Sequence, residues 1–102
     1  MISPTQNTLK QLRKNGYLCQ VVERFNMFAK VRVDLFGIID IVAIKPKEIL
    51  GVQATSAINH TTRAAKAKAS DSLKAWKEAG GKFEVWSWRK VKNKWQYRKE
   101  SL

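Results

Sequence analysis

Apolar residues at helical spacing open the chain, and their flanking residues mark the two ends of a helix. Two leucines lie about one turn apart on one side, while the other side is polar and basic. Ser3 suits a helix cap and Pro4 suits the first turn, where its missing N–H costs nothing. Gly16 is a typical residue just after a helix end. The pattern therefore predicts a helix over residues 5–15.

Three apolar segments follow, and each is typical of a strand. Residues 17–25 are rich in β-forming residues and are followed by a loop near 26–30. Residues 34–44 form an almost unbroken apolar run, which is typical of a central strand covered on both faces. A turn at 45–48, with proline in its second position, leads to a strand over 49–55. We expect the last two strands to form a hairpin.

The second half of the chain predicts one long helix and one or two strands. Residues 59–79 place alanines, a leucine and a tryptophan on one stripe, and two glycines end the segment. A strand is predicted over 82–88 and a short further strand over 95–98, after a turn at Asn93. The order α-β-β-β-α-β, with an optional last strand, predicts an α/β fold in which helices flank a small mixed sheet.

The composition of the chain indicates what kind of partner it binds. The 102 residues suit one domain, 1–102, and the 44% hydrophobic content suits a folded core. Lys and Arg number 20 against 8 Asp and Glu, so the formal net charge is +12. Such an excess favours a polyanionic partner, with nucleic acid ahead of a membrane surface.

Residue counts exclude several kinds of chemistry. Cys19 and His60 are single, so they cannot form a zinc finger or a disulfide within the chain. The five glycines spell neither a P-loop nor a dinucleotide-binding turn, so no nucleotide cofactor is expected. No segment resembles a signal peptide or a membrane span. These counts favour a protein of the reducing cytoplasm.

Asp40 interrupts the most apolar segment of the chain and therefore needs a structural reason. A buried carboxylate is costly unless it is paired or binds a metal. If the hairpin turns at residues 46–47, Asp40 faces Gln53 on the neighbouring strand, and Thr55 points to the same side. Glu23, on the preceding strand, can supply a second carboxylate. Asp40, Glu23 and Gln53 are therefore the predicted ligands of Mg²⁺ or Mn²⁺.

At this hairpin the sequence resembles the PD-(D/E)xK nuclease superfamily, and within it the Holliday junction resolvases and the VRR-NUC nucleases. Asp40 lies three positions after Gly37, as in one form of the family's first motif, and residues 49–55 match the following strand. The resemblance covers about residues 5–90. It implies a restriction-endonuclease-like α-β-β-β-α-β core, a metal-dependent DNA endonuclease acting on branched or duplex DNA, a homodimer, and a prokaryotic or phage-infected host cell.

The resemblance also assigns catalytic positions, with two departures from the family pattern. Gln53 lies where the family usually has Glu, and Thr55 where it usually has Lys. Arg63 or Lys66, in the following helix, can supply the missing cation. The resemblance thus implies a catalytic set of Asp40, Gln53, Glu23, Thr55 and Lys66.

Two basic segments are predicted to contact DNA phosphates. One is a stripe of the long helix and the other is the aromatic-rich C-terminal ribbon, where bases can also stack. Their members are Arg63, Lys66, Lys74 and Lys77 in the helix and Arg89, Lys90, Lys92 and Lys94 in the ribbon.

Other interpretations remain open for several of these residues. Asp34 either joins the site or caps a loop, and Glu23 either joins it or forms a surface ion pair with Arg24 or Arg32. His60 is interpreted as a residue of the helix N-terminus rather than a phosphate contact. For the whole chain, the alternatives are a non-catalytic nucleic-acid-binding domain on the same fold and a nuclease subunit of a larger assembly.

Overall fold

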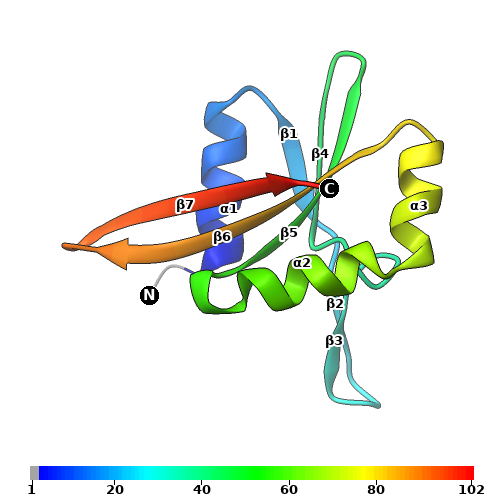
Figure 1. The fold of residues 1–102 in the computed structure, drawn as a ribbon, viewed down its shortest axis with the longest axis horizontal. Coiled ribbons are helices and arrows are strands. Elements are labelled where there is room, and N and C mark those ends of the chain that lie inside the picture. Colours follow the sequence, from blue (N-terminus) through cyan, green and yellow to red (C-terminus); the bar gives the residue numbers. More distant parts are fainter. Residues whose placement is uncertain (1–2) are drawn as a thin grey trace.

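A five-stranded mixed sheet with helices on both faces organises the computed structural model, which describes residues 3–102 (Figure 1). A separate two-stranded hairpin extends from the sheet. The elements are α1 (Pro4–Lys14), β1 (Leu18–Val21), β2 (Arg24–Asn26), β3 (Val31–Val33), β4 (Ile41–Lys45), β5 (Glu48–Ser56), the 3₁₀ turn η1 (Ala57–Asn59), α2 (His60–Lys68), α3 (Asp71–Glu78), β6 (Lys82–Val91) and β7 (Lys94–Ser101).

The strand order of the sheet is β1-β4-β5-β6-β7. Strand β4 runs antiparallel to both β1 and β5, β6 runs parallel to β5, and β7 closes the edge antiparallel to β6. Ile41 pairs with Val52 and Lys45 with Glu48, so the hairpin turns at residues 46–47 in the predicted register. The α/β class and the small mixed sheet are confirmed.

Side chains on the two faces of the sheet form two separate cores. Beneath α1, Leu12 packs with Trp86 and Trp88, which are 1% and 6% exposed. Beneath α2 and α3, Phe83 and Val85 pack against the alanines and leucine of those helices. Alternation along β6 thus sends its two tryptophans to one core and its phenylalanine and valine to the other.

The strand predicted over 34–44 begins later than expected, at Ile41. Residues 34–40 form a tight turn in which Leu35 pairs with Ile39, and Gly37 has a φ of 77°, a conformation that glycine adopts without a Cβ penalty. Two consecutive isoleucines of this turn are buried, so an apolar run that resembles a strand is partly a buried turn. The strand predicted over 17–25 is likewise divided, into β1 and β2.

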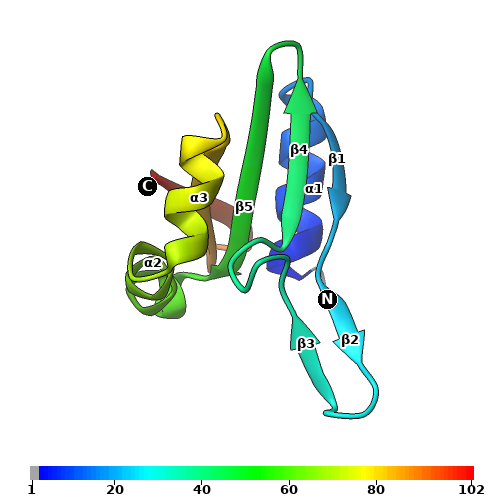
Figure 2. The ribbon, with the colours of Figure 1, turned by 90° about the vertical axis from the view of Figure 1, so that its right-hand side faces the viewer.

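The β2–β3 hairpin was not predicted, and it projects from one end of the sheet (Figure 2). Asn26 shapes its turn, because its side-chain oxygen accepts hydrogen bonds from the backbone N–H groups of Phe28 and Ala29, at 3.0 and 3.1 Å. The hairpin carries apolar side chains in solvent, including Met27, which is 78% exposed, and a fully exposed Phe28.

The single helix predicted over 59–79 is wrong, because the chain breaks at Ser70 into α2 and α3. Ser70 has extended backbone angles, and its side chain accepts a hydrogen bond from Ser72 N at 3.2 Å, which is the geometry of an N-cap. Asp71 follows in the first turn, where a negative charge is favourable. This Ser-Asp pair is the signal in the sequence that marks the break.

Removing the cap should weaken α3. We expect Ser70→Ala to lower the free energy of unfolding by about 1 kcal/mol, because one helical N–H loses its acceptor. The control is Ser72→Ala, which keeps the donating backbone N–H and should cost less than about half as much. Urea denaturation followed by circular dichroism measures both, and equal effects would contradict the capping role.

The C-terminal ribbon is longer than predicted. Strands β6 and β7 pair over eight residue pairs, from Glu84–Ser101 to Val91–Lys94. The turn between them consists of Lys92 and Asn93, both with positive φ, as a two-residue hairpin turn requires. Across residues 3–102, none of the helices has the length and apolar character needed to cross a membrane.

Candidate metal centre

Three carboxylates meet where the β2–β3 hairpin joins the sheet. Glu23 immediately precedes β2, Asp34 immediately follows β3, and Asp40 immediately precedes β4. One carboxylate oxygen from each residue lies within 4.8 Å of the other two. Glu23 and Asp40 were both predicted for the site, and Asp34, for which site membership was one of two interpretations, lies close to both. We call these three residues the acidic cluster.

The two oxygens of Asp40 have different environments. Oδ2 accepts hydrogen bonds from Gln53 Nε2 at 2.8 Å and from the backbone N–H of Ala54 at 2.9 Å. Oδ1 is buried and has no hydrogen-bond partner within the described residues 3–102. The whole residue is only 3% exposed. One oxygen is therefore held by hydrogen bonds from β5, whereas the other is desolvated.

This environment raises the pKa of Asp40 to about 8. Burial is the main cause, because it penalises the charged form, and the adjacent carboxyl group of Asp34 is the next, because it can accept a hydrogen bond from a protonated Asp40 and repels the charged form. The charge of Glu23 adds to the rise, and the N–H of Ala54 opposes it. The cluster therefore favours a bound positive charge, either a proton or a cation.

Glu23 combines the two roles that the sequence left open. Its Oε1 forms an ion pair with Arg32 on β3, at 3.1 Å, while its carboxylate also belongs to the acidic cluster. The Arg32 side chain is 74% exposed, so this pair contributes little stability on its own. Its main effect is to hold Glu23 near the base of the hairpin.

Gln53 lies beside Asp40 as predicted, but its amide nitrogen donates to that carboxylate. The contact makes Gln53 a residue that orients Asp40, while Asp34 is the third carboxylate of the cluster. Thr55 lies two residues further along β5 on the same face and is buried. It carries no charge with which to replace the lysine of the nuclease pattern.

The predicted basic stripe is divided between two helices. Arg63 and Lys66 lie on α2, whereas Lys74 and Lys77 lie on α3 beyond the break at Ser70. Within the part of the chain that the structure describes, neither Arg63 nor Lys66 forms an ion pair with the acidic cluster. Arg32 on β3, which sequence reasoning gave only as a surface partner of Glu23, is the cation that does.

The four basic residues of the ribbon lie on different sides of it. Arg89 shares its face with α2, whereas Lys90 points to the α1 side, with its Nζ 5.9 Å from the ring centre of Trp95. Lys92 occupies the turn and Lys94 begins β7. All four lie in the part of the ribbon nearest its turn and concentrate positive charge there.

His60 begins α2 as expected, but its buried contacts were missed. Its ring is held between Ser87 Oγ, 2.6 Å from Nδ1, and Glu100 Oε1, 2.8 Å from Nε2. Strand alternation in β6 places Ser87 on the α2 side of the sheet. This alternation is the signal in the sequence that points to its contact with His60. The partner Glu100 comes from the part of β7 that was not predicted.

Comparison with known proteins yields no match to the chain among family models, curated proteins or solved structures. Functional inference therefore rests on the geometry of this chain and on the sequence resemblance, and above all on the acidic cluster.

Proposed function

We propose that this chain is a metal-dependent DNA endonuclease with a restriction-endonuclease-like core. The observation that carries the proposal is the buried Asp40, whose Oδ1 lacks a partner among residues 3–102 and lies beside two further carboxylates. The fold supports it, because the order α1-β1-β4-β5-α2-β6, with β6 parallel to β5, follows the core that the sequence resemblance implies. The β2–β3 hairpin, α3 and β7 are additions to that core.

The acidic cluster suits a divalent cation for two reasons: its donors are carboxylate oxygens, and the Oδ1 atom of Asp40 is desolvated. All three groups of the acidic cluster offer carboxylate oxygens, which Mg²⁺ and Mn²⁺ prefer. Asp40, Asp34 and Glu23 would hold the ion, and Gln53 with the N–H of Ala54 would keep Asp40 oriented. When bound, the ion supplies a polarised phosphate oxygen and a water of lowered pKa. In this ligand set Asp34 takes the place that the sequence hypothesis gave to Gln53.

The basic surface supports DNA as the substrate. Residues 60–102, which include α2, α3 and the ribbon, hold 12 Lys and Arg against 4 Asp and Glu and so carry +8 of the net charge of +12, whereas the acidic cluster lies outside these elements. Such an arrangement attracts a polyanion while leaving a local position for a cation. The preference for branched DNA and the homodimer remain parts of this proposal that rest on the sequence resemblance.

One observation favours a second function, DNA binding without cleavage. Thr55 lies where the nuclease pattern has a lysine, and no lysine or arginine other than Arg32 forms an ion pair with the acidic cluster in the described residues. A fixed cation near the reacting phosphate normally stabilises the transition state. The two functions share the fold and the DNA surface, so only a cleavage assay separates them.

The test incubates the protein with linear, flapped and four-way DNA in Mg²⁺ or Mn²⁺. We expect cleavage that Asp40→Asn lowers by more than about 100-fold, since even the loss of a group that orients a metal ligand costs about 10–100-fold. The asparagine oxygen of this variant can accept both hydrogen bonds now made to Oδ2, so its fold should persist. Glu78→Gln, at an exposed acid on α3, is the matched control. Tight, salt-sensitive DNA binding with no cleavage in either metal would overturn the endonuclease.

A further inference from the structure

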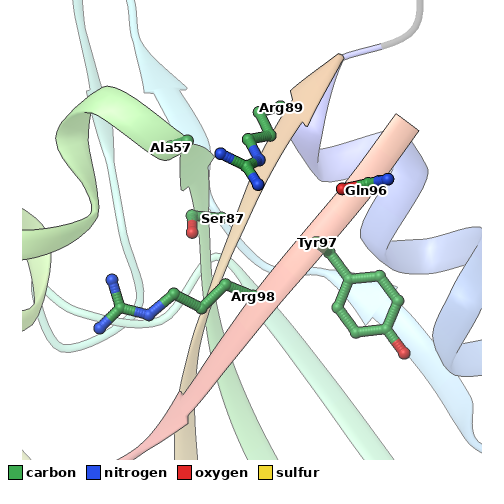
Figure 3. A pocket seen from close by; sticks show the side chains of 6 residues that line it. All are labelled: Ala57, Ser87, Arg89, Gln96, Tyr97 and Arg98. Carbon is green, nitrogen blue, oxygen red and sulfur yellow. The ribbon is translucent and has the colours of Figure 1, made fainter. Parts of the chain in front are cut away.

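A cavity of about 380 Å³ opens between η1 and the β6–β7 ribbon, on the sheet face that carries Asp40 and Gln53 (Figure 3). In Figure 3 the side chains of Arg89, from β6, and Arg98, from β7, lie on either side of Ser87. The ring of Tyr97 instead stacks on Trp86 on the opposite face. The lining residues are Ala57, Ser87, Arg89, Gln96, Tyr97 and Arg98.

The lining of this cavity is cationic and rich in hydrogen-bond donors. Two guanidinium groups and one side-chain amide face it, and no acidic residue is among its lining residues in the described chain. The nearest acid, Glu100, is already engaged by His60 at 2.8 Å and Lys68 at 3.4 Å. Arg98 approaches Glu100 only to 3.8 Å, so its donors are not satisfied by that acid.

The floor of the cavity is rigid. Ser87 is 3% exposed, and its Oγ lies 2.6 Å from Nδ1 of His60, which is itself 2% exposed. His60 is fixed in turn by Glu100. These hydrogen bonds join the start of α2 to β6 and β7. They hold the two arginine-bearing strands against the helix and pre-organise the cavity.

Register relates the cavity to the acidic cluster. Ser87 pairs with Thr55 on β5, and Thr55 lies two residues beyond Gln53, which contacts Asp40. Two strand spacings of ~4.8 Å, from β6 to β5 and from β5 to Asp40, and a two-residue step of ~6.6 Å place the cavity floor on the order of 12 Å from the carboxylates. Since one DNA strand carries a phosphate for every ~3.4 Å of helix axis, a strand that spans this separation has more than one phosphate along it.

We infer that this cavity is a phosphate subsite in which Arg89 and Arg98 bind a backbone phosphate of the DNA strand that crosses the acidic cluster. Paired guanidinium donors suit the tetrahedral oxygens of a phosphate. The inference rests on the proposed function for its DNA ligand. It also fixes the position of the DNA strand on the protein, because one phosphate is held at the arginines while another lies at the carboxylates. Ser87, His60 and Glu100 are positioning residues for this subsite.

The test measures binding of a fluorescent 20-base-pair duplex by anisotropy in EDTA, so that cleavage plays no part. We expect Arg89→Gln and Arg98→Gln each to weaken binding by about ten-fold at low salt. The double variant should lose about 0.9 from the slope of log K against log salt, the amount that corresponds to one phosphate contact. Lys99→Gln is the matched control, because its Nζ lies over the Trp86 ring on the opposite face. Wild-type affinity and slope in the double variant would overturn the subsite.

A second arm distinguishes DNA from a small phosphorylated ligand. Inorganic phosphate or a deoxynucleoside monophosphate at millimolar concentration should stabilise the wild type against heat only slightly, because one phosphate lacks the neighbouring contacts of a strand. Strong stabilisation that the double variant abolishes, with DNA binding unchanged, would overturn the DNA assignment. A wild type that binds DNA with the expected slope but never cleaves it would refute the endonuclease and still support the subsite.

Discussion

In EDTA, the wild-type protein should become steadily less stable than Asp40→Asn as the pH rises from 5 to 8.5. The raised pKa of Asp40, about 8, means that the folded protein holds a proton which the unfolded chain releases near pH 4. Between these values the folded state binds more protons, so raising the pH lowers the free energy of unfolding. This contribution is complete below about pH 4 and is lost as the pH passes about 8.

The expected difference between the two proteins is large. Each pH unit between about 4 and 8 corresponds to about 1.4 kcal/mol, so the stability advantage of Asp40→Asn over the wild type should grow by on the order of 4 kcal/mol between pH 5 and pH 8.5. Asparagine resembles the protonated aspartate and can place its oxygen at the Oδ2 position, where Gln53 and Ala54 donate. Urea titrations at several pH values give the free energy of unfolding of each protein. The contributions of the other titrating groups cancel in the difference between the two proteins.

Adding Mg²⁺ or Mn²⁺ should reverse this difference at pH 8. A cation held by the acidic cluster stabilises the folded wild type by mass action, whereas the neutral side chain of Asp40→Asn contributes no charge to hold it. Parallel pH curves for the two proteins in EDTA would contradict the desolvated state of Asp40. Stability that no divalent ion changes would contradict the metal centre.

Trp86→Ala should be the most damaging single truncation in the ribbon. Trp86 is 1% exposed, its ring stacks on Tyr97 with centroids 4.9 Å apart, and its Nε1 donates to Glu84 at 2.9 Å. Its removal leaves a cavity beneath α1, so we expect the free energy of unfolding to fall by about 3–5 kcal/mol. Urea denaturation followed by circular dichroism measures the loss.

The matched control is Trp95→Ala on the same ribbon, where the residue is 39% exposed and should cost under about 1 kcal/mol. If Trp86→Ala does not fold, Trp86→Phe serves instead and should lose about 1–2 kcal/mol, because it keeps the aromatic ring in part. Similar losses for positions 86 and 95 would show that the ribbon does not pack on α1 as described.

The central hairpin could be predicted from sequence because several local signals agree there. The apolar run, the proline turn and strand alternation all require the pairing of Ile41 with Val52, which brings Asp40 beside Gln53. The same alternation divides β6 correctly between two cores. A one-residue slip would move every side chain of a strand to the opposite face of the sheet, so few alternative registers remain.

Membership of Asp34 in the site was only one of two interpretations, because hydrophobicity does not distinguish a buried turn from a strand. Residues 34–40 are as apolar as the strand that follows them, and Ile38 and Ile39 are both buried although the backbone turns between Leu35 and Ile39. The break at Ser70 was missed for a similar reason, since a helical stripe of alanines continues across a cap. In both cases tertiary packing, which no local pattern records, decides the outcome.

The β2–β3 hairpin joins the body of the protein through Glu23 on one side and Asp34 on the other. Two of the three carboxylates therefore lie at the base of a hairpin whose tip bears Met27 and Phe28 in solvent. The backbone N–H groups of Val22 and Glu23 donate to the backbone oxygen of Asp40, at 2.8 and 3.3 Å, so one side of the hairpin base is tied to the third acid. The position of this exposed apolar hairpin is thus coupled, through the backbone at its base, to the spacing of the three carboxylates.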